Sequence, residues 1–163
     1  MKIIKAVLIS IAISLISLLP VHSQANYNNH KLGIGFGYPY LSLKYCMNSR
    51  FAAEIRDNYE SGIQVLGARF YFNLGILDSS IIYCGTEADY IKFDTNDVEG
   101  DGYLGQIFLG FEQFINKSLA ISLDIGPSYI SLTEKNYSDV TVSGVDWITN
   151  IGINYYFDFN KSQ

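Results

Sequence analysis

Histidine, the usual general base beside a serine nucleophile, is scarce in this chain. It has two histidines, His22 and His30, and a Ser-His-acid arrangement needs a histidine as its base. His22 falls in a predicted export signal and His30 precedes the first predicted strand, so we predict that the chain is not an enzyme. Two histidines also make no zinc site here. Cys46 and Cys84 have no metal or redox spacing, and we interpret them as unpaired buried residues, with a single disulfide as the alternative.

The stretch DTNDVEGDG, residues 94–102, places Asp97, Glu99 and Asp101 as alternating oxygen donors. A calcium loop needs a bidentate glutamate at its twelfth position, which is Phe108 when the count begins at Asp97. We therefore predict an acidic, solvated loop that is at most a weak site for a divalent cation. We predict no metal centre and no cofactor.

A third set of ionisable residues falls on the polar sides of segments with alternating hydrophobicity. These residues are Lys44, Glu54, Arg56, Arg69, Glu87, Asp89, Glu112, Asp124, Asp146 and Asp158. If these sides share one interior, the side chains must pair in an ionic network, because an unpaired buried charge is costly. Seven acids face three bases, so some carboxylates need water or neutral hydrogen-bond donors. We predict a structural network of polar side chains, and a narrow cation-preferring channel is the alternative.

The first 25 residues have the three-part pattern of a secretory signal peptide. Two lysines precede an apolar run over 6–19, and a proline and small residues follow up to Ala25. We predict that residues 1–25 are removed and that residues 26–163 form one domain.

The composition of this domain excludes some partners and favours β-structure. Without the two signal lysines it has 9 basic and 16 acidic residues, a formal charge of −7, and no basic stripe for a nucleic acid. Only 17% of the chain is charged, whereas soluble domains have about a quarter. No run of eighteen apolar residues follows the signal, so no helix is predicted to span a membrane.

Alternating hydrophobicity predicts eight β-strands after the signal peptide. They lie near residues 32–38, 41–47, 51–56, 66–74, 80–93, 103–115, 118–132 and 142–159. The connections at 57–61, 94–102 and 133–141 are polar and are predicted to be loops at one end of the sheet, opposite short turns. This asymmetry is typical of outer-membrane barrels.

The residue types on the two strand faces decide which face meets water. One face is apolar, and the other is mostly glycine, serine and asparagine with occasional charges, which suits a narrow barrel interior better than a solvated surface. The aromatic side chains are predicted to point outward and to form two girdles, because amphipathic aromatic rings prefer the two interfaces of a bilayer. The girdles comprise Tyr38, Tyr40, Tyr90, Tyr103, Tyr129 and Trp147 near the loops, and Met47, Phe70, Phe72, Phe114, Tyr155, Phe157 and Phe159 near the turns. We therefore predict that the apolar face contacts lipid and that the sheet closes, since an open edge in hydrocarbon leaves backbone groups unpaired.

These residues resemble the small eight-stranded outer-membrane barrels of the OmpA/OmpX type. The resemblance covers nearly the whole predicted domain, and its most specific part is the run of alternating rings Tyr155, Phe157 and Phe159, which resembles the C-terminal signal read by the barrel-assembly machinery. The resemblance implies an exported protein of a Gram-negative outer membrane, with outer-membrane lipids and that machinery as partners.

We therefore predict an all-β, eight-stranded, up-and-down transmembrane barrel that is a monomer with a structural or surface-interaction role. Its predicted loops 94–102 and 133–141 would present acidic tips to an extracellular ligand. A small cation-preferring channel or ligand-transport barrel is one alternative. A soluble periplasmic lipocalin-like binding protein is the other.

Overall fold

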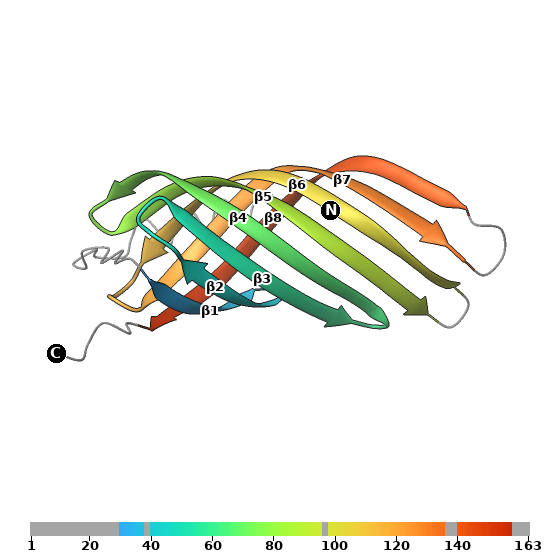
Figure 1. Cartoon of the computed structure of the whole chain (residues 1–163), viewed down its shortest axis with the longest axis horizontal. Coiled ribbons are helices and arrows are strands. Elements are labelled where there is room, and N and C mark those ends of the chain that lie inside the picture. Colours follow the sequence, from blue (N-terminus) through green and yellow to red (C-terminus); the bar gives the residue numbers. More distant parts are fainter. Residues whose placement is uncertain (1–29, 38–39, 96–97, 136–139, 158–163) are drawn as a thin grey trace, which may run out of the picture.

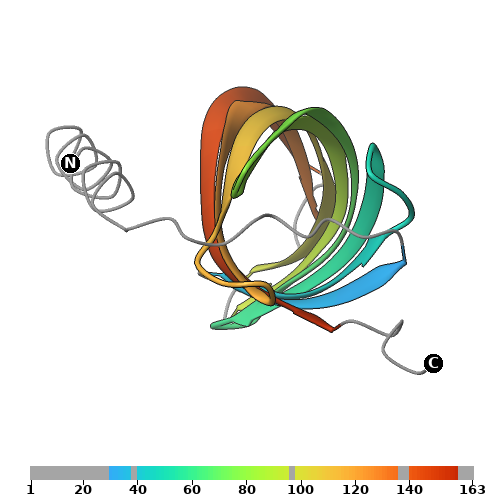
Figure 2. The ribbon, with the colours of Figure 1, turned by 90° about the vertical axis from the view of Figure 1, so that its left-hand side faces the viewer.

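The computed structural model describes residues 30–37, 40–95, 98–135 and 140–157, so the predicted signal peptide lies outside the described residues. Eight antiparallel strands each pair with their neighbours in sequence, and β8 pairs with β1 to close the ring (Figures 1 and 2). The strands are β1 (Lys31–Gly37), β2 (Leu41–Cys46), β3 (Phe51–Glu60), β4 (Ile63–Leu77), β5 (Ser80–Thr95), β6 (Val98–Phe114), β7 (Leu119–Glu134) and β8 (Thr141–Phe157). The fold is the all-β, eight-stranded, up-and-down barrel that the alternation predicts.

The alternation of side chains orients each strand in the ring. In β7, Ala120, Ser122 and Asp124 are buried, whereas Ile125 is exposed. Large apolar side chains such as Ile107 are exposed on the outside, and charged side chains such as Lys44, Arg69 and Asp124 are buried within. Because successive strand residues point to opposite faces, the closed sheet has an apolar exterior and a polar axis.

The strands differ greatly in length, and this corrects part of the sequence analysis. β1 and β2 have 7 and 6 residues, whereas β4 to β8 have 15 to 17, and the long strands project well beyond β1 and β2 (Figure 1). The prediction of loops at 57–61 and 94–102 was wrong, because strands continue through most of both segments. The polar residues there belong to strands, because an uninterrupted ladder joins β3 to β4 and β5 to β6.

The tip between β3 and β4 shows how such a long hairpin turns. Ser61 and Gly62 both have positive φ, 50° and 84°, which is the requirement of a two-residue turn that matches the strand twist. The loop predicted at 133–141 is only slightly shorter than expected, since β7 ends at Glu134 and β8 begins at Thr141.

Glycines in β1 leave room for side chains of neighbouring strands. A Cβ at Gly33 would lie 2.8 Å from the ring of Tyr156, and one at Gly37 would overlap the ring of Tyr40. We infer that these glycines admit large inward rings where the axis is narrow.

Two of the predicted outward rings lie inside instead. Tyr40 is buried with its ring under the Arg56 guanidinium, 3.8 Å from Cζ to the ring centroid, and Phe114 is buried against Tyr156. Phe114 follows the inward parity of β6, and Tyr40 lies two residues before Ser42 and shares the inward parity of β2. The prediction of an outward position was therefore wrong for both.

The other predicted girdle residues that the structure describes have partly or largely exposed side chains. They are Met47, Phe70, Phe72, Tyr90, Tyr103, Tyr129, Trp147, Tyr155 and Phe157. Tyr38 and Phe159 lie outside the described residues. Among the described residues, no helix has the length and apolar character needed to cross a membrane.

Two glycines give a matched test of this packing. A Cβ at Gly126 would overlap the backbone carbonyl of Ile107, whereas one at Gly105 would meet nothing within 4 Å. We expect Gly126→Ala to lower the free energy of unfolding by roughly 1–3 kcal/mol, because backbone cannot move aside as a side-chain end can. Gly105→Ala should be neutral or stabilising, and urea unfolding in detergent micelles measures both. Equal effects of the two substitutions would contradict the packing described.

Candidate functional site: the charged barrel interior

The structure places eight of the ten proposed interior residues on strands β2 to β7 with side chains directed to the axis. They are Lys44, Glu54, Arg56, Arg69, Glu87, Asp89, Glu112 and Asp124. Of the other two, Asp158 lies outside the described residues. Asp146 has the inward parity of β8 but is exposed near the projecting end of that strand, where its carboxylate accepts a hydrogen bond from the Trp147 N–H.

Arg69 lies at the centre of the ionic network. Its guanidinium donates two hydrogen bonds to Asp124, at 2.7 and 2.9 Å, and a third to Glu87 at 2.9 Å. The side chain is fully buried, and Phe108 lies beneath it with its centroid 3.8 Å from Cζ. A two-pronged contact between a guanidinium and a carboxylate fixes orientation as well as charge.

A second arginine links two more carboxylates to this centre. Arg56 lies 3.4 Å from Glu54 and 3.4 Å from Glu87, so Glu87 is shared between two guanidinium groups. The hydroxyl of Tyr71 donates a hydrogen bond to Glu54 and accepts one from Arg69. The network is therefore continuous across β3, β4, β5 and β7.

A separate charge pair lies nearer the short turns. Lys44 lies 3.1 Å from Glu112, and the Glu112 carboxylate also accepts hydrogen bonds from Asn154 at 2.7 Å and Tyr156 at 2.6 Å. Three donors satisfy one buried carboxylate, which is the condition under which a buried charge is tolerated.

Aromatic rings separate the two groups of charges. Tyr71, Tyr83 and Phe108 are almost completely buried and meet edge to face, with centroids 5.2 to 6.2 Å apart. Lys44 lies over the Tyr71 ring at 4.5 Å, and Arg69 lies over Phe108. The rings fill the axis between the cations, and cation–π contacts hold them in place.

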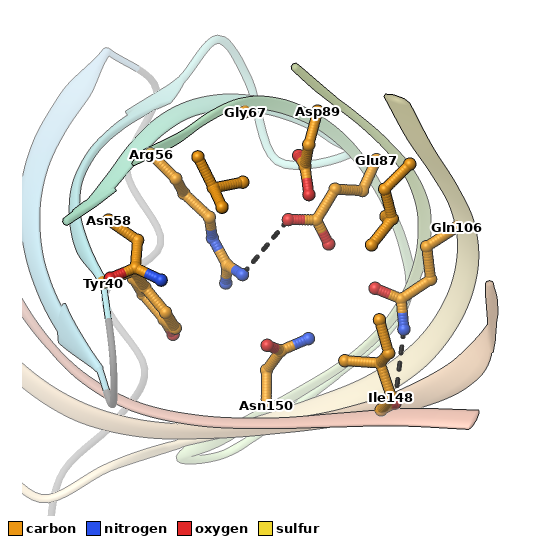
Figure 3. A pocket seen from close by; sticks show the side chains of 11 residues that line it. Tyr40, Arg56, Asn58, Gly67, Glu87, Asp89, Gln106, Ile148 and Asn150 are labelled. Atoms are coloured by element: carbon orange, nitrogen blue, oxygen red, sulfur yellow. Dashed lines mark hydrogen bonds and ion pairs between the residues drawn. The ribbon is translucent and has the colours of Figure 1, made fainter. Parts of the chain in front are cut away.

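A cavity of about 140 Å³ lies above this layer, on the side of the β1–β2 and β3–β4 connections (Figure 3). We call it the outer cavity. Its lining residues are Tyr40, Arg56, Asn58, Val65, Gly67, Glu87, Asp89, Leu104, Gln106, Ile148 and Asn150. Asp89 is the one proposed lumen residue among the eight that takes part in no ion pair between described residues.

The acidic stretch considered as a weak cation site is not a loop. Glu99 and Asp101 lie on β6 opposite Asp94 and Lys92 of β5, and Asp97 lies outside the described residues. The Lys135 ammonium forms an ion pair with Asp101, which raises the pKa of that ammonium through a hydrogen bond and the carboxylate charge. No group of three or more His, Cys, Asp or Glu among the described residues is placed to hold a metal ion.

The remaining candidate residues lie apart from the ionic network. His30 is exposed, and its Nδ1 lies 2.8 Å from the Tyr45 hydroxyl. Cys46 is buried and Cys84 is half-buried, and no disulfide joins them.

Several interior residues were not among those predicted for the site. They are the neutral partners Tyr71, Tyr83, Gln106, Phe108, Asn150, Asn154 and Tyr156. Their inward parity is visible in the alternation, but we selected by charge and passed over them. The arrangement as a whole pairs and immobilises charges.

Arg69→Met tests the network directly. It should lower the free energy of unfolding by roughly 3–5 kcal/mol, because it leaves Asp124 and Glu87 short of a buried partner. The exposed Arg50→Met is the control and should change it by less than about 0.5 kcal/mol. Urea unfolding in detergent measures both variants.

A double variant separates charge from packing. Adding Asp124→Asn to Arg69→Met should recover part of the lost free energy of unfolding, because the substitution removes the buried carboxylate charge that Arg69→Met leaves without a partner. If the two single substitutions lower the free energy of unfolding by amounts that add up in the double variant, the two side chains do not stabilise the barrel as a pair.

Comparison with known proteins supports the fold alone. No family model matches the chain, and no curated protein matches it. The structure is similar to the crystal structure of the N-terminal β-barrel domain of Pseudomonas aeruginosa OprF, with a TM-score of 0.51, 8% sequence identity, and coverage of 78% of this chain and 94% of that chain. This chain therefore has the eight-stranded barrel fold of that domain.

Proposed function

We propose that the chain is a non-enzymatic outer-membrane barrel with a closed lumen, whose role is structural or lies in surface interaction. The observation that carries this proposal is an exposed apolar exterior around a ring whose charged side chains are buried. A water-soluble barrel needs the opposite arrangement, because its exterior must be densely charged.

The dimensions of the strands agree with a bilayer. A residue in a strand rises about 3.4 Å and barrel strands tilt by about 40°, so an apolar band about 25 Å tall takes roughly ten residues. Counted from the short turns, this length includes Leu109, Ile125 and Ile151, which are all exposed. The strands of 15 to 17 residues extend past it into water.

The interior supports a role other than conduction or catalysis. Three cations are paired with four carboxylates, and buried rings fill the axis between the two groups. An ion would have to break a charge-assisted network to pass.

The projecting part of β8 favours interaction at the surface. β1 pairs with β8 only over Gly152–Phe157, so among the described strands residues 141–151 pair with β7 alone. This edge has no lysine, arginine or proline, which are the residues that usually protect an open edge. An extended strand of another protein could therefore add to the sheet here.

The same edge argues for a monomer. Asp146 lies at the middle of residues 141–151, so antiparallel pairing of two copies centred there would set Asp146 against Asp146. Like charges placed directly opposite destabilise a strand pair. We therefore propose that the partner strand belongs to another protein.

A pair of lysine substitutions tests the lipid-facing band. Leu109 is 55% exposed at the predicted mid-plane and Val145 is 72% exposed on the projecting part of β8. Leu109→Lys should lower folding stability in lipid bilayers by roughly 2–4 kcal/mol, whereas Val145→Lys should change it little. If both variants fold equally well and partition into the aqueous fraction, the protein is the soluble binding protein and not a membrane barrel.

Fractionation and conductance test the remaining claims. The chain should be recovered with outer membranes, should migrate faster on a gel when unheated, and should give no conductance steps in a planar bilayer. Regular cation-selective steps would instead establish the channel. Accelerated turnover of an ester or phosphate substrate that is lost in the Glu87→Gln variant would contradict the non-enzymatic role.

A further inference from the structure

Buried polar atoms without a partner gather at the outer cavity. Six buried side-chain polar atoms of the described residues lack a hydrogen bond, and three of them are oxygens of residues that line this cavity: Asn58 Oδ1, Asp89 Oδ1 and Gln106 Oε1. A buried oxygen without a donor costs free energy, so such atoms usually have a protein, water or ligand partner.

Gln106 is the most informative of the three. Its side chain is 97% buried, and its Nε2 donates to the backbone carbonyls of Gly126 and Ile148 at 3.3 and 3.2 Å. These two contacts fix the amide, and its carbonyl oxygen points to the middle of the cavity (Figure 3). The cavity is therefore built to accept hydrogen bonds from whatever occupies it.

The charge of the residues that line the cavity indicates the sign of the charge on its occupant. Glu87 is already paired with Arg56 and Arg69, whereas Asp89 takes part in no ion pair between described residues. One carboxylate thus remains to be neutralised, and the Asp89 carboxylate is directed toward the cavity from β5 (Figure 3).

The rest of the lining indicates the kind of cation. Val65, Leu104 and Ile148 form an apolar wall beside the oxygens, which suits a short hydrocarbon and not a hydrated metal ion. The absence of a cluster of three metal-ligating side chains in the described chain points the same way. A primary ammonium has one charge and several N–H donors, which suits the Asp89 carboxylate and the Gln106 carbonyl oxygen.

We propose that the outer cavity binds a small organic cation, a primary ammonium with a short aliphatic body. The ammonium group donates to Asp89 and Gln106, and the aliphatic body lies against Leu104 and Ile148. The lining residues come from β3, β4, β5, β6 and β8 and from Tyr40, which lies between β1 and β2. This site lies above the closed part of the lumen and does not require conduction or a particular membrane.

The test uses the full chain folded in detergent micelles, with n-propylammonium chloride as the probe at pH 7 and low salt. Methyl-labelled NMR follows Val65, Leu104 and Ile148, whose signals should shift in a saturable way at roughly millimolar concentrations, as for a ligand of very few atoms. n-Propanol, which lacks the charge, and magnesium chloride, which lacks the aliphatic body, should leave these signals unchanged.

Two aspartate variants test which carboxylate binds the ammonium probe. Asp89→Asn should weaken binding of the probe by at least about tenfold, because it removes the charge-assisted hydrogen bond. Asp57→Asn removes the same charge from the exposed outward side of β3 and should change the affinity by less than about twofold. Leu104→Phe narrows the cavity without changing its charge, so it should also abolish binding and serves if Asp89→Asn does not fold.

The proposal fails if the three methyl groups do not respond to the probe, which would mean that water alone satisfies the oxygens. It also fails if n-propanol shifts them equally or if Asp89→Asn and Leu104→Phe both bind as the wild type does. A response to magnesium in place of the probe would show a metal site instead.

Discussion

Every second residue of eight strands points at one narrow axis, and that crowding governs the rest of this structure. A ring of eight strands has an interior only wide enough for its own side chains. Large inward residues therefore need small ones opposite them, as Gly33 does for Tyr156. The same shortage of space brings charged side chains into contact, so charges that are far apart in sequence, such as Arg69 and Asp124, become direct partners.

Such contacts explain how a polar interior can hold a barrel together. Each of the three central cations meets at least one carboxylate, and tyrosines, asparagines and a glutamine supply the remaining hydrogen bonds. Buried charges stabilise only when they are fully paired, and here the rings of Tyr83 and Phe108 exclude water between two paired groups. The neutral residues therefore matter as much as the charged ones, because they complete the partners' hydrogen bonding.

Unequal strand length gives the barrel a low side and a high side. β1 and β2 end early, and the long strands continue past them (Figure 1). One consequence is a cavity that opens beside Tyr40, where the lumen is no longer filled. The other is the open edge of β8, whose backbone groups have no strand beside them among the described residues. Both features proposed for recognition thus arise from one difference in length.

The sequence alone determined the period of the strands, the strand number and the face that most strand residues take, because a two-residue alternation can be recognised without knowing which strands are neighbours. It also identified most of the charged interior residues, because charged side chains on the inward face of a closed sheet point into its interior. The lengths of the strands were not predictable in this way: residues 57–61 and 94–102 are polar because they stand in water, and water-exposed strand and loop have similar compositions. Only the tertiary structure decided which charges pair and that Asp89 remains without an ion partner. These outcomes depend on the register between strands and on the space left by residues across the axis.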